Sequence, residues 1–160
     1  MLHDIGKIIL SYLYPDQYRK ILIEVQGKEL DLKSIENHYF GVDHEEVGGI
    51  YAKIHRFPPA IQSSIRYHGS IGEAGENQIS AALIQLANFF AHRFGLGFSG
   101  SYHDVTTDLR DLDAWPVLFY ASRSLRTPPS EEELDDCIAN KIIDLRSFLE
   151  NAFPIKTKDK

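Results

Sequence analysis

The first residues of the chain place a histidine, an aspartate and a lysine within five positions. His3 and Asp4 are adjacent, and Lys7 follows Asp4 by about one helical turn. Imidazole nitrogens and carboxylate oxygens are ligands that divalent metals take from proteins. A lysine ammonium can bind a phosphate group as a point charge. This stretch therefore predicts half of a divalent-metal site, with a candidate phosphate-binding cation beside it.

Three further residues could complete such a site. His44 begins a predicted helix, His68 lies at the end of another, and Asn88 lies on the inward side of a third. The ligands of a site built by tertiary packing need no fixed local spacing, so sequence separations neither support nor exclude this grouping. A helical fold can bring all three residues towards the N-terminal pair.

Each candidate residue also has an interpretation without metal. Asp4 could orient His3 by hydrogen bonding inside the bundle, and Lys7 could be a solvated helix residue. His44 could be a neutral, hydrogen-bonded ring at a helix start, His68 a helix cap, and Asn88 a satisfied core amide. The residue types alone leave both sets of interpretations open.

Apolar residues repeat with helical spacing along most of the chain. Together with Pro and Gly breakers they predict helices over residues 2–13, 15–26, 32–40, 44–56, 58–68, 78–94 and 131–153. Residues 69–76 are predicted to form a loop. We find no alternating strand pattern and no sustained heptad, so the fold class is predicted to be all-α, a compact helical bundle.

Bulky apolar residues predict the inward faces of two of these helices. The stripe of the 44–56 helix is Val47, Ile50, Tyr51 and Ile54, and that of the 78–94 helix is Ile79, Leu83, Leu86, Ala87, Phe90 and Phe94. Asp43 with Glu46, and Ser130 with Glu133, have the spacing of N-terminal capping boxes.

Composition favours a soluble cytoplasmic protein. The chain has 160 residues, is 43% hydrophobic and carries a net charge of −6, which suits one domain over residues 1–153 and a disordered tail over 154–160. The acidic balance argues against nucleic acid as the main partner. The single cysteine, Cys137, excludes an internal disulfide and fits a reducing compartment. We find no apolar run long enough to cross a membrane and no signal peptide.

The position of the motif at the start of the chain is unusual. Metal sites seldom lie at a fraying terminus, yet His3 follows only two residues. We therefore expect that the chain is the later part of a larger domain, whose N-terminal helices are missing.

Three blocks of sequence resemble a known family. Residues 2–7 (LHDIGK) resemble the signature of the HD superfamily of helical metal-dependent phosphohydrolases. Residues 40–49 (FGVDHEEVGG) and 57–68 (FPPAIQSSIRYH) resemble blocks of its HDOD family. The resemblance covers roughly residues 2–95. It implies a bacterial, HD-domain-like helical bundle with a regulatory role, in a family where many members have lost their metal ligands.

The resemblance also implies a partial metal site. The implied ligands are His3, Asp4, His44 and His68, with Asn88 at the position of the family's last aspartate. His68 matches the first of two adjacent histidines, and Gly69 stands in place of the second. A neutral amide is a poor substitute for a carboxylate, and the superfamily's first histidine has no counterpart in this chain.

These matches and departures lead to a ranked set of expectations. The first is a non-catalytic signal-transduction module that binds signalling proteins, an attached sensor domain or a second copy of itself. The alternative is a phosphohydrolase acting on a nucleotide or cyclic dinucleotide, with a divalent metal (Fe, Mn or Mg) and Lys7 on the phosphate. A third is a sensor that binds a nucleotide without turnover.

Overall fold

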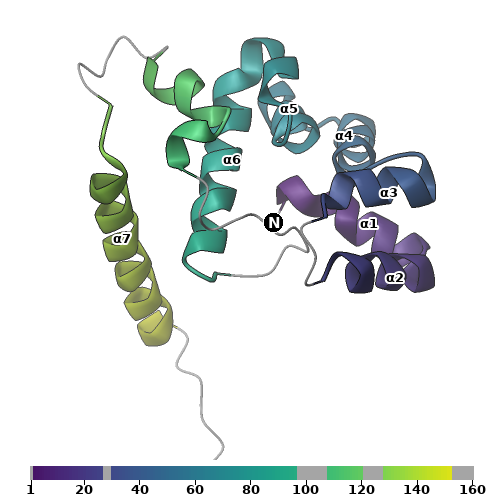
Figure 1. The fold of residues 1–160 in the computed structure, drawn as a ribbon, viewed down its shortest axis with the longest axis horizontal. Coiled ribbons are helices and arrows are strands. Elements are labelled where there is room, and N and C mark those ends of the chain that lie inside the picture. The colour runs from purple at the N-terminus through teal and green to yellow at the C-terminus, as the bar shows by residue number, and fades with distance from the viewer. Residues whose placement is uncertain (1, 27–29, 97–107, 121–127, 153–160) are drawn as a thin grey trace, which may run out of the picture. The chain divides into compact units, whose positions relative to one another are not determined.

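The computed structural model describes residues 2–26, 30–96, 108–120 and 128–152. It divides the chain into two compact units, residues 1–125 and 126–160, and each is described by itself. The domain expected over residues 1–153 spans both units, and the tail expected over 154–160 lies outside the described residues. All regular secondary structure in the described ranges is helical, which confirms the all-α prediction (Figure 1).

The described residues of the first unit form six α-helices and several short turns. In chain order these are η1 (Leu2–Asp4), α1 (Ile5–Leu13), α2 (Pro15–Val25), α3 (Leu32–Phe40), α4 (His44–Ile54), α5 (Pro59–Tyr67), η2 (Ile71–Glu73), η3 (Gly75–Asn77), α6 (Gln78–Arg93), η4 (Leu109–Asp111) and the π-helical turn η5 (Pro116–Tyr120). Two details differ from expectation. The first helix opens with a 3₁₀ turn, and the loop expected over residues 69–76 contains two more.

The junction between α3 and α4 is fixed by two residues. Gly41 ends α3 with a φ of 73°, a left-handed conformation that glycine adopts without a steric penalty. Asp43 then caps α4, because its side chain accepts a hydrogen bond of 2.8 Å from the backbone N–H of Glu46. The predicted N-cap is confirmed, and it fixes the start of α4, where His44 is the first residue.

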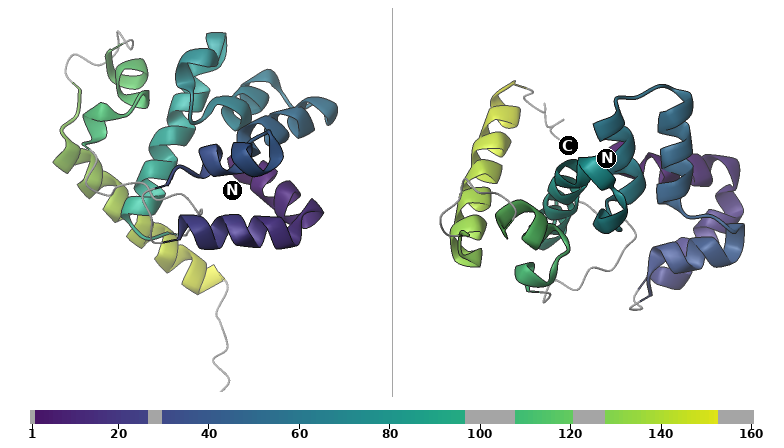
Figure 2. Two further views of the ribbon diagram at one scale, coloured as in Figure 1. Left: turned by 45° about the vertical axis from the view of Figure 1, so that its right-hand side comes forward. Right: turned by 90° about the horizontal axis from the view of Figure 1, so that it is seen from above.

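The helices of this unit contact one another largely in chain order. α1 packs against α2 and α4, α4 against α5, and α5 against α6. In the three views of Figures 1 and 2, the purple and blue helices α1 to α4 lie together and the teal α6 lies beside them. The η1 turn contacts both α4 and α5. The packing therefore places the N-terminal motif against the helices that carry His44 and His68.

Glycine allows α1 and α4 to approach closely. A Cβ atom at Gly6 would lie 1.9 Å from the carbonyl oxygen of His44 and 2.9 Å from the backbone nitrogen of Gly48. The two backbones are therefore in direct contact, and no side chain fits between them.

The predicted inward face of α4 is wrong at Ile50 and Ile54, although Val47 does pack against the core. Ile50 and Ile54 are 54% and 71% exposed, whereas the buried residues are His44, Glu45, Gly48 and Ala52. Because α1 and α5 pack closely on α4, the buried face is made of small residues and of the polar residues of the site. The large apolar residues of α4 therefore do not identify its buried face.

The predicted inward face of α6 is also largely wrong. Ile79 and Leu83 are more than half exposed, and Ala87 is exposed too. The buried residues of α6 are Ala81, Ala82, Phe89 and Phe90, of which only Phe90 was expected. The two alanines join a core cluster with Ile71, Ala74 and Ala114. A second cluster, between α1, α2 and α3, contains Leu10, Tyr18, Ile21, Val25 and Leu32.

The second unit contributes one described helix, α7 (Glu131–Ala152). Its start is a reciprocal capping box. The backbone N–H of Ser130 donates to Glu133 Oε2 at 2.7 Å, and the N–H of Glu133 donates to Ser130 Oγ at 3.1 Å. These hydrogen bonds lower the pKa of Glu133 and confirm the predicted box. Among the described helices, none combines the length and hydropathy that crossing a membrane requires.

Candidate functional site

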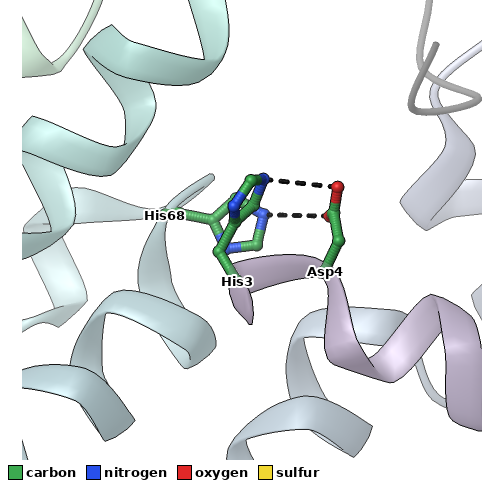
Figure 3. Close-up of side chains that lie close together, drawn as sticks. All are labelled: His3, Asp4 and His68. Atoms are coloured by element: carbon green, nitrogen blue, oxygen red, sulfur yellow. Dashed lines mark ion pairs between the residues drawn. The ribbon is translucent and has the colours of Figure 1, made fainter. Parts of the chain in front are cut away.

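Four of the five residues predicted as metal ligands lie together in the first unit. Asp4, on η1, is central: its Oδ2 lies 3.3 Å from Nε2 of His3, and its Oδ1 lies 3.7 Å from Nε2 of His44 and 3.9 Å from Nε2 of His68. Figure 3 shows the Asp4 carboxylate facing the His3 and His68 rings. We refer to His3, Asp4, His44 and His68 as the histidine cluster.

The three imidazole rings of the cluster are in contact. The centroids of the His3 and His68 rings are 4.8 Å apart in an edge-to-face arrangement, and those of His44 and His68 are 5.8 Å apart. His44 starts α4 and His68 caps the end of α5, so the cluster joins η1, α4 and α5.

The His44 ring is oriented by Glu36, a residue that the sequence did not single out. Glu36 is fully buried, and its Oε2 accepts from both Nδ1 and the backbone N–H of His44, the latter at 2.9 Å. Its Oε1 accepts from the hydroxyl of Tyr18 at 2.7 Å. Because Nδ1 is engaged with Glu36, Nε2 of His44 is the ring nitrogen that faces the cluster, as in the carboxylate–histidine pairs of metal sites.

The His68 ring is also oriented by a contact of its Nδ1 atom. Its Nδ1 lies 3.0 Å from the carbonyl oxygen of Ile65, and a carbonyl oxygen can only accept. The proton of the neutral ring is therefore on Nδ1, and the lone pair of Nε2 points towards Asp4. Burial is the largest cause of the lowered pKa of His68, which is about 3.

Lys7 is bound to the central carboxylate. Its Nζ lies 2.9 Å from Asp4 Oδ1, and its side chain is only 14% exposed, so Lys7 is not a solvated helix residue. Burial alone would raise the pKa of Asp4. The hydrogen bond from His3 and the charge of Lys7 outweigh burial, so this pKa lies below its ordinary value. Asp4 is therefore an ionised carboxylate that already holds an ammonium group.

Glu45 is a second residue that the sequence did not single out. Its side chain is 2% exposed, and its Oε1 lies 3.1 Å from Lys33 Nζ and 3.7 Å from His68 Nε2. Burial raises the pKa of Glu45, and the charge of Lys33 opposes this. The only signal in the sequence is its position beside His44, and the mistaken inward face of α4 concealed it.

Asn88 lies on α6 and is half-buried. The structure forms two groups of metal-capable His, Asp and Glu side chains within its described ranges, and neither includes a residue of α6. The role inferred for Asn88 stays a prediction.

The two donor groups share one histidine. The first is His3, Asp4 and His68, and the second is His44, Glu45 and His68; within each group the donor atoms lie within 4.8 Å of one another. Either group can converge on one divalent ion with small side-chain shifts, because metal–ligand bonds of about 2.0–2.2 Å place neighbouring donors about 3.0–3.5 Å apart. In the first group, Lys7 competes with a metal for Asp4.

Comparison with known proteins agrees with this geometry. Residues 1–71 match the family model of the HDOD domain. The fold resembles a crystal structure described as an HDOD domain protein with unknown function from Geobacter sulfurreducens, with a TM-score of 0.72 and 23% sequence identity. That similarity covers 95% of this chain and 51% of the other, so the chain spans about half its length. No curated protein matches.

These findings define an all-α domain with the fold of an HDOD domain protein. Within it, residues 1–71 are similar to the HDOD family.

The neutral state of His68 predicts a dependence of stability on pH. Below its ordinary pKa of 6.5 the unfolded chain binds a proton at this residue, whereas the folded chain does so only near pH 3. Stability is therefore lost as pH falls through this window, by about 1.4 kcal/mol between pH 7.5 and 5.5 from this residue alone. Urea unfolding of the wild type and of His68→Gln should show that the variant loses about that much less stability over the same range.

His55, which is exposed on the C-terminal side of α4, offers the control. His55→Gln should keep the wild-type pH dependence. Equal slopes for the wild type and His68→Gln would contradict the prediction.

Proposed function

We propose that the chain is a regulatory HDOD-type module that works through contacts with signalling proteins and does not hydrolyse phosphoesters. The observation that carries this proposal is the position of Lys7, whose ammonium lies 2.9 Å from Asp4 Oδ1. In a metal-dependent phosphohydrolase of this superfamily, that carboxylate would hold the metal.

The charges around the cluster support the same proposal. Asp4 is paired with Lys7, and Glu45 with Lys33. Glu36 accepts hydrogen bonds from three donors on Tyr18 and His44. A site that activates water with metal needs enough negative charge and an open coordination position. Here the carboxylates are already compensated, and the amide of Asn88 supplies no further charge.

The partners that fit this proposal are signalling proteins, a sensor domain attached to the same protein, or a second copy of the chain. A bacterial cytoplasmic setting suits a chain with one cysteine and a net charge of −6. A bound nucleotide would serve as a signal rather than as a substrate.

One observation favours phosphohydrolase activity as a second candidate function. Nε2 of both His44 and His68 faces Asp4, and the opposite nitrogen of each ring is held by Glu36 or Ile65. His3, Asp4, His44 and His68 would hold the divalent metal, which would supply Lewis acidity and an activated water. Lys7 would then have to leave Asp4 for the phosphate.

Hydrolysis of a phosphodiester decides between these two functions. We expect that the purified protein, supplied with Mn²⁺, Fe²⁺ or Mg²⁺, hydrolyses bis(p-nitrophenyl) phosphate and cyclic dinucleotides no faster than its Asp4→Asn variant does. Metal-dependent turnover that disappears in the folded Asp4→Asn protein would overturn the proposed function and establish the second.

A further inference from the structure

One carboxylate oxygen of Glu45 is buried and has no hydrogen-bond partner among the described residues. Its Oε1 is held by Lys33, whereas its Oε2 is buried and accepts no hydrogen bond from the described residues. A buried carboxylate oxygen without a donor is costly, so an atom in this position is either strained or awaits a ligand. Because the whole side chain is 2% exposed, water does not readily supply the missing interaction.

Gly69 makes the room that the Glu45 carboxylate occupies. A Cβ atom at Gly69 would lie 2.4 Å from Glu45 Oε1 and 3.4 Å from Lys33 Nζ. A side chain at position 69 and the carboxylate would therefore compete for the same space beside His68. The carboxylate lies where it does because position 69 has no side chain.

Three acceptor atoms converge at this point. The Nδ1 atoms of His44 and His68 are engaged with Glu36 and with the Ile65 carbonyl, so both Nε2 atoms present lone pairs. One nitrogen of each ring and one carboxylate oxygen of Glu45 form a fully buried group whose members lie within 4.8 Å of one another, with Nε2 of His68 3.7 Å from Glu45 Oε1. Acceptor atoms this close repel one another, and a cation between them would remove that repulsion.

We propose that Glu45 is the carboxylate ligand of a divalent transition-metal site, completed by Nε2 of His44 and Nε2 of His68. This inference rests on the function proposed above, since the metal is here a bound regulatory ligand that ties the start of α4 to the end of α5. Lys33 acts as a positioning residue, because it holds Glu45 Oε1, which lies 3.7 Å from Nε2 of His68. Two imidazoles and one carboxylate suit Zn²⁺, Fe²⁺ or Mn²⁺, whereas Mg²⁺ and Ca²⁺ prefer oxygen ligands only.

Two features separate this group from the one around Asp4. Both oxygens of Asp4 lie beside another side chain, Oδ1 beside Lys7 and Oδ2 beside His3. Glu45 has an oxygen that no described residue uses. The metal is therefore expected at Glu45, and the loss of the Asp4 carboxylate should leave it bound.

Manganese binding to the full chain tests the assignment. The loss of the free Mn²⁺ electron paramagnetic resonance signal, measured without any substrate, should give one bound ion per chain. Glu45→Gln should weaken binding at least about tenfold, since even outer residues of metal sites contribute that much. The control is Glu46→Gln, which removes a neighbouring carboxylate that is 41% exposed and faces Arg66. It should bind as the wild type does.

A second pair of variants covers the case in which Glu45→Gln does not fold. Gly69→Ala displaces the flexible end of the Glu45 side chain and should weaken Mn²⁺ binding, whereas Gly72→Ala, whose Cβ would meet nothing within 4 Å, should not. The assignment is overturned if the wild type binds no Mn²⁺, if Gly69→Ala binds as the wild type does, or if Asp4→Asn abolishes binding while Glu45→Gln retains it. None of these results depends on turnover, so the proposed function is judged separately.

Discussion

Gly6→Ala is expected to lower the free energy of unfolding by about 3 kcal/mol, the upper end of the usual cost of overpacking. The added Cβ would meet the carbonyl group of His44 and the backbone nitrogen of Gly48, and backbone atoms cannot rotate away as a side chain does. α1 and α4 must then separate, which also moves His44 away from Asp4. Urea denaturation monitored by circular dichroism measures the loss.

The matched control for this variant is Gly72→Ala. Position 72 has no strained backbone angle and open space around its Cβ, so this change should be neutral within about 0.5 kcal/mol. If Gly6→Ala were as stable as Gly72→Ala, the close contact between α1 and α4 would not exist as described.

Glu36→Ala should destabilise the fold by about 4 kcal/mol. Glu36 is fully buried and accepts hydrogen bonds from the Tyr18 hydroxyl, the His44 backbone N–H and His44 Nδ1. Its removal strands three buried donors and leaves a cavity. The same denaturation experiment measures the effect, and the histidine signals in an NMR spectrum should show that the His44 ring loses its fixed orientation.

An exposed version of the same interaction provides the comparison. Tyr39 donates its hydroxyl to Glu24 at 3.2 Å on the surface of α2 and α3. Glu24→Ala should change stability by less than about 0.5 kcal/mol, because water replaces the lost hydrogen bond. Similar losses for Glu24→Ala and Glu36→Ala would show that Glu36 does not organise the buried cluster.

The sequence predicts the helices well because their signals are local. Pro15, Gly41 and Asp43 act within one turn of their own positions, and the helices they delimit agree with the predicted ranges to within a few residues. The capping box of Ser130 and Glu133 is equally local.

The inward faces are predicted poorly because they depend on neighbouring helices. α4 buries Gly48 and Ala52 and exposes Ile50 and Ile54, since the approach of α1 leaves no room for bulk. Hydrophobic periodicity assumes that the largest apolar residues are buried, and that assumption fails where helix backbones touch.

The sequence predicts the histidine cluster but misses the two buried glutamates, which depend on helix packing. The histidine cluster was accessible through the resemblance of residues 2–7 and 40–68 to the HD and HDOD blocks. Glu36 and Glu45 were missed because acidic residues in helices are usually on the surface, and only packing shows that both are buried. Glu36 did carry one signal, since it follows the buried Leu32 by four residues and so shares its helix face.

The central claim is that Lys7, and not a metal, holds the Asp4 carboxylate. The most direct test is the anomalous diffraction of crystals of this protein soaked in Mn²⁺. The account predicts one manganese peak beside Glu45, His44 and His68, with the Lys7 ammonium still on Asp4. A manganese ion coordinated by Asp4, with Lys7 displaced, would contradict it.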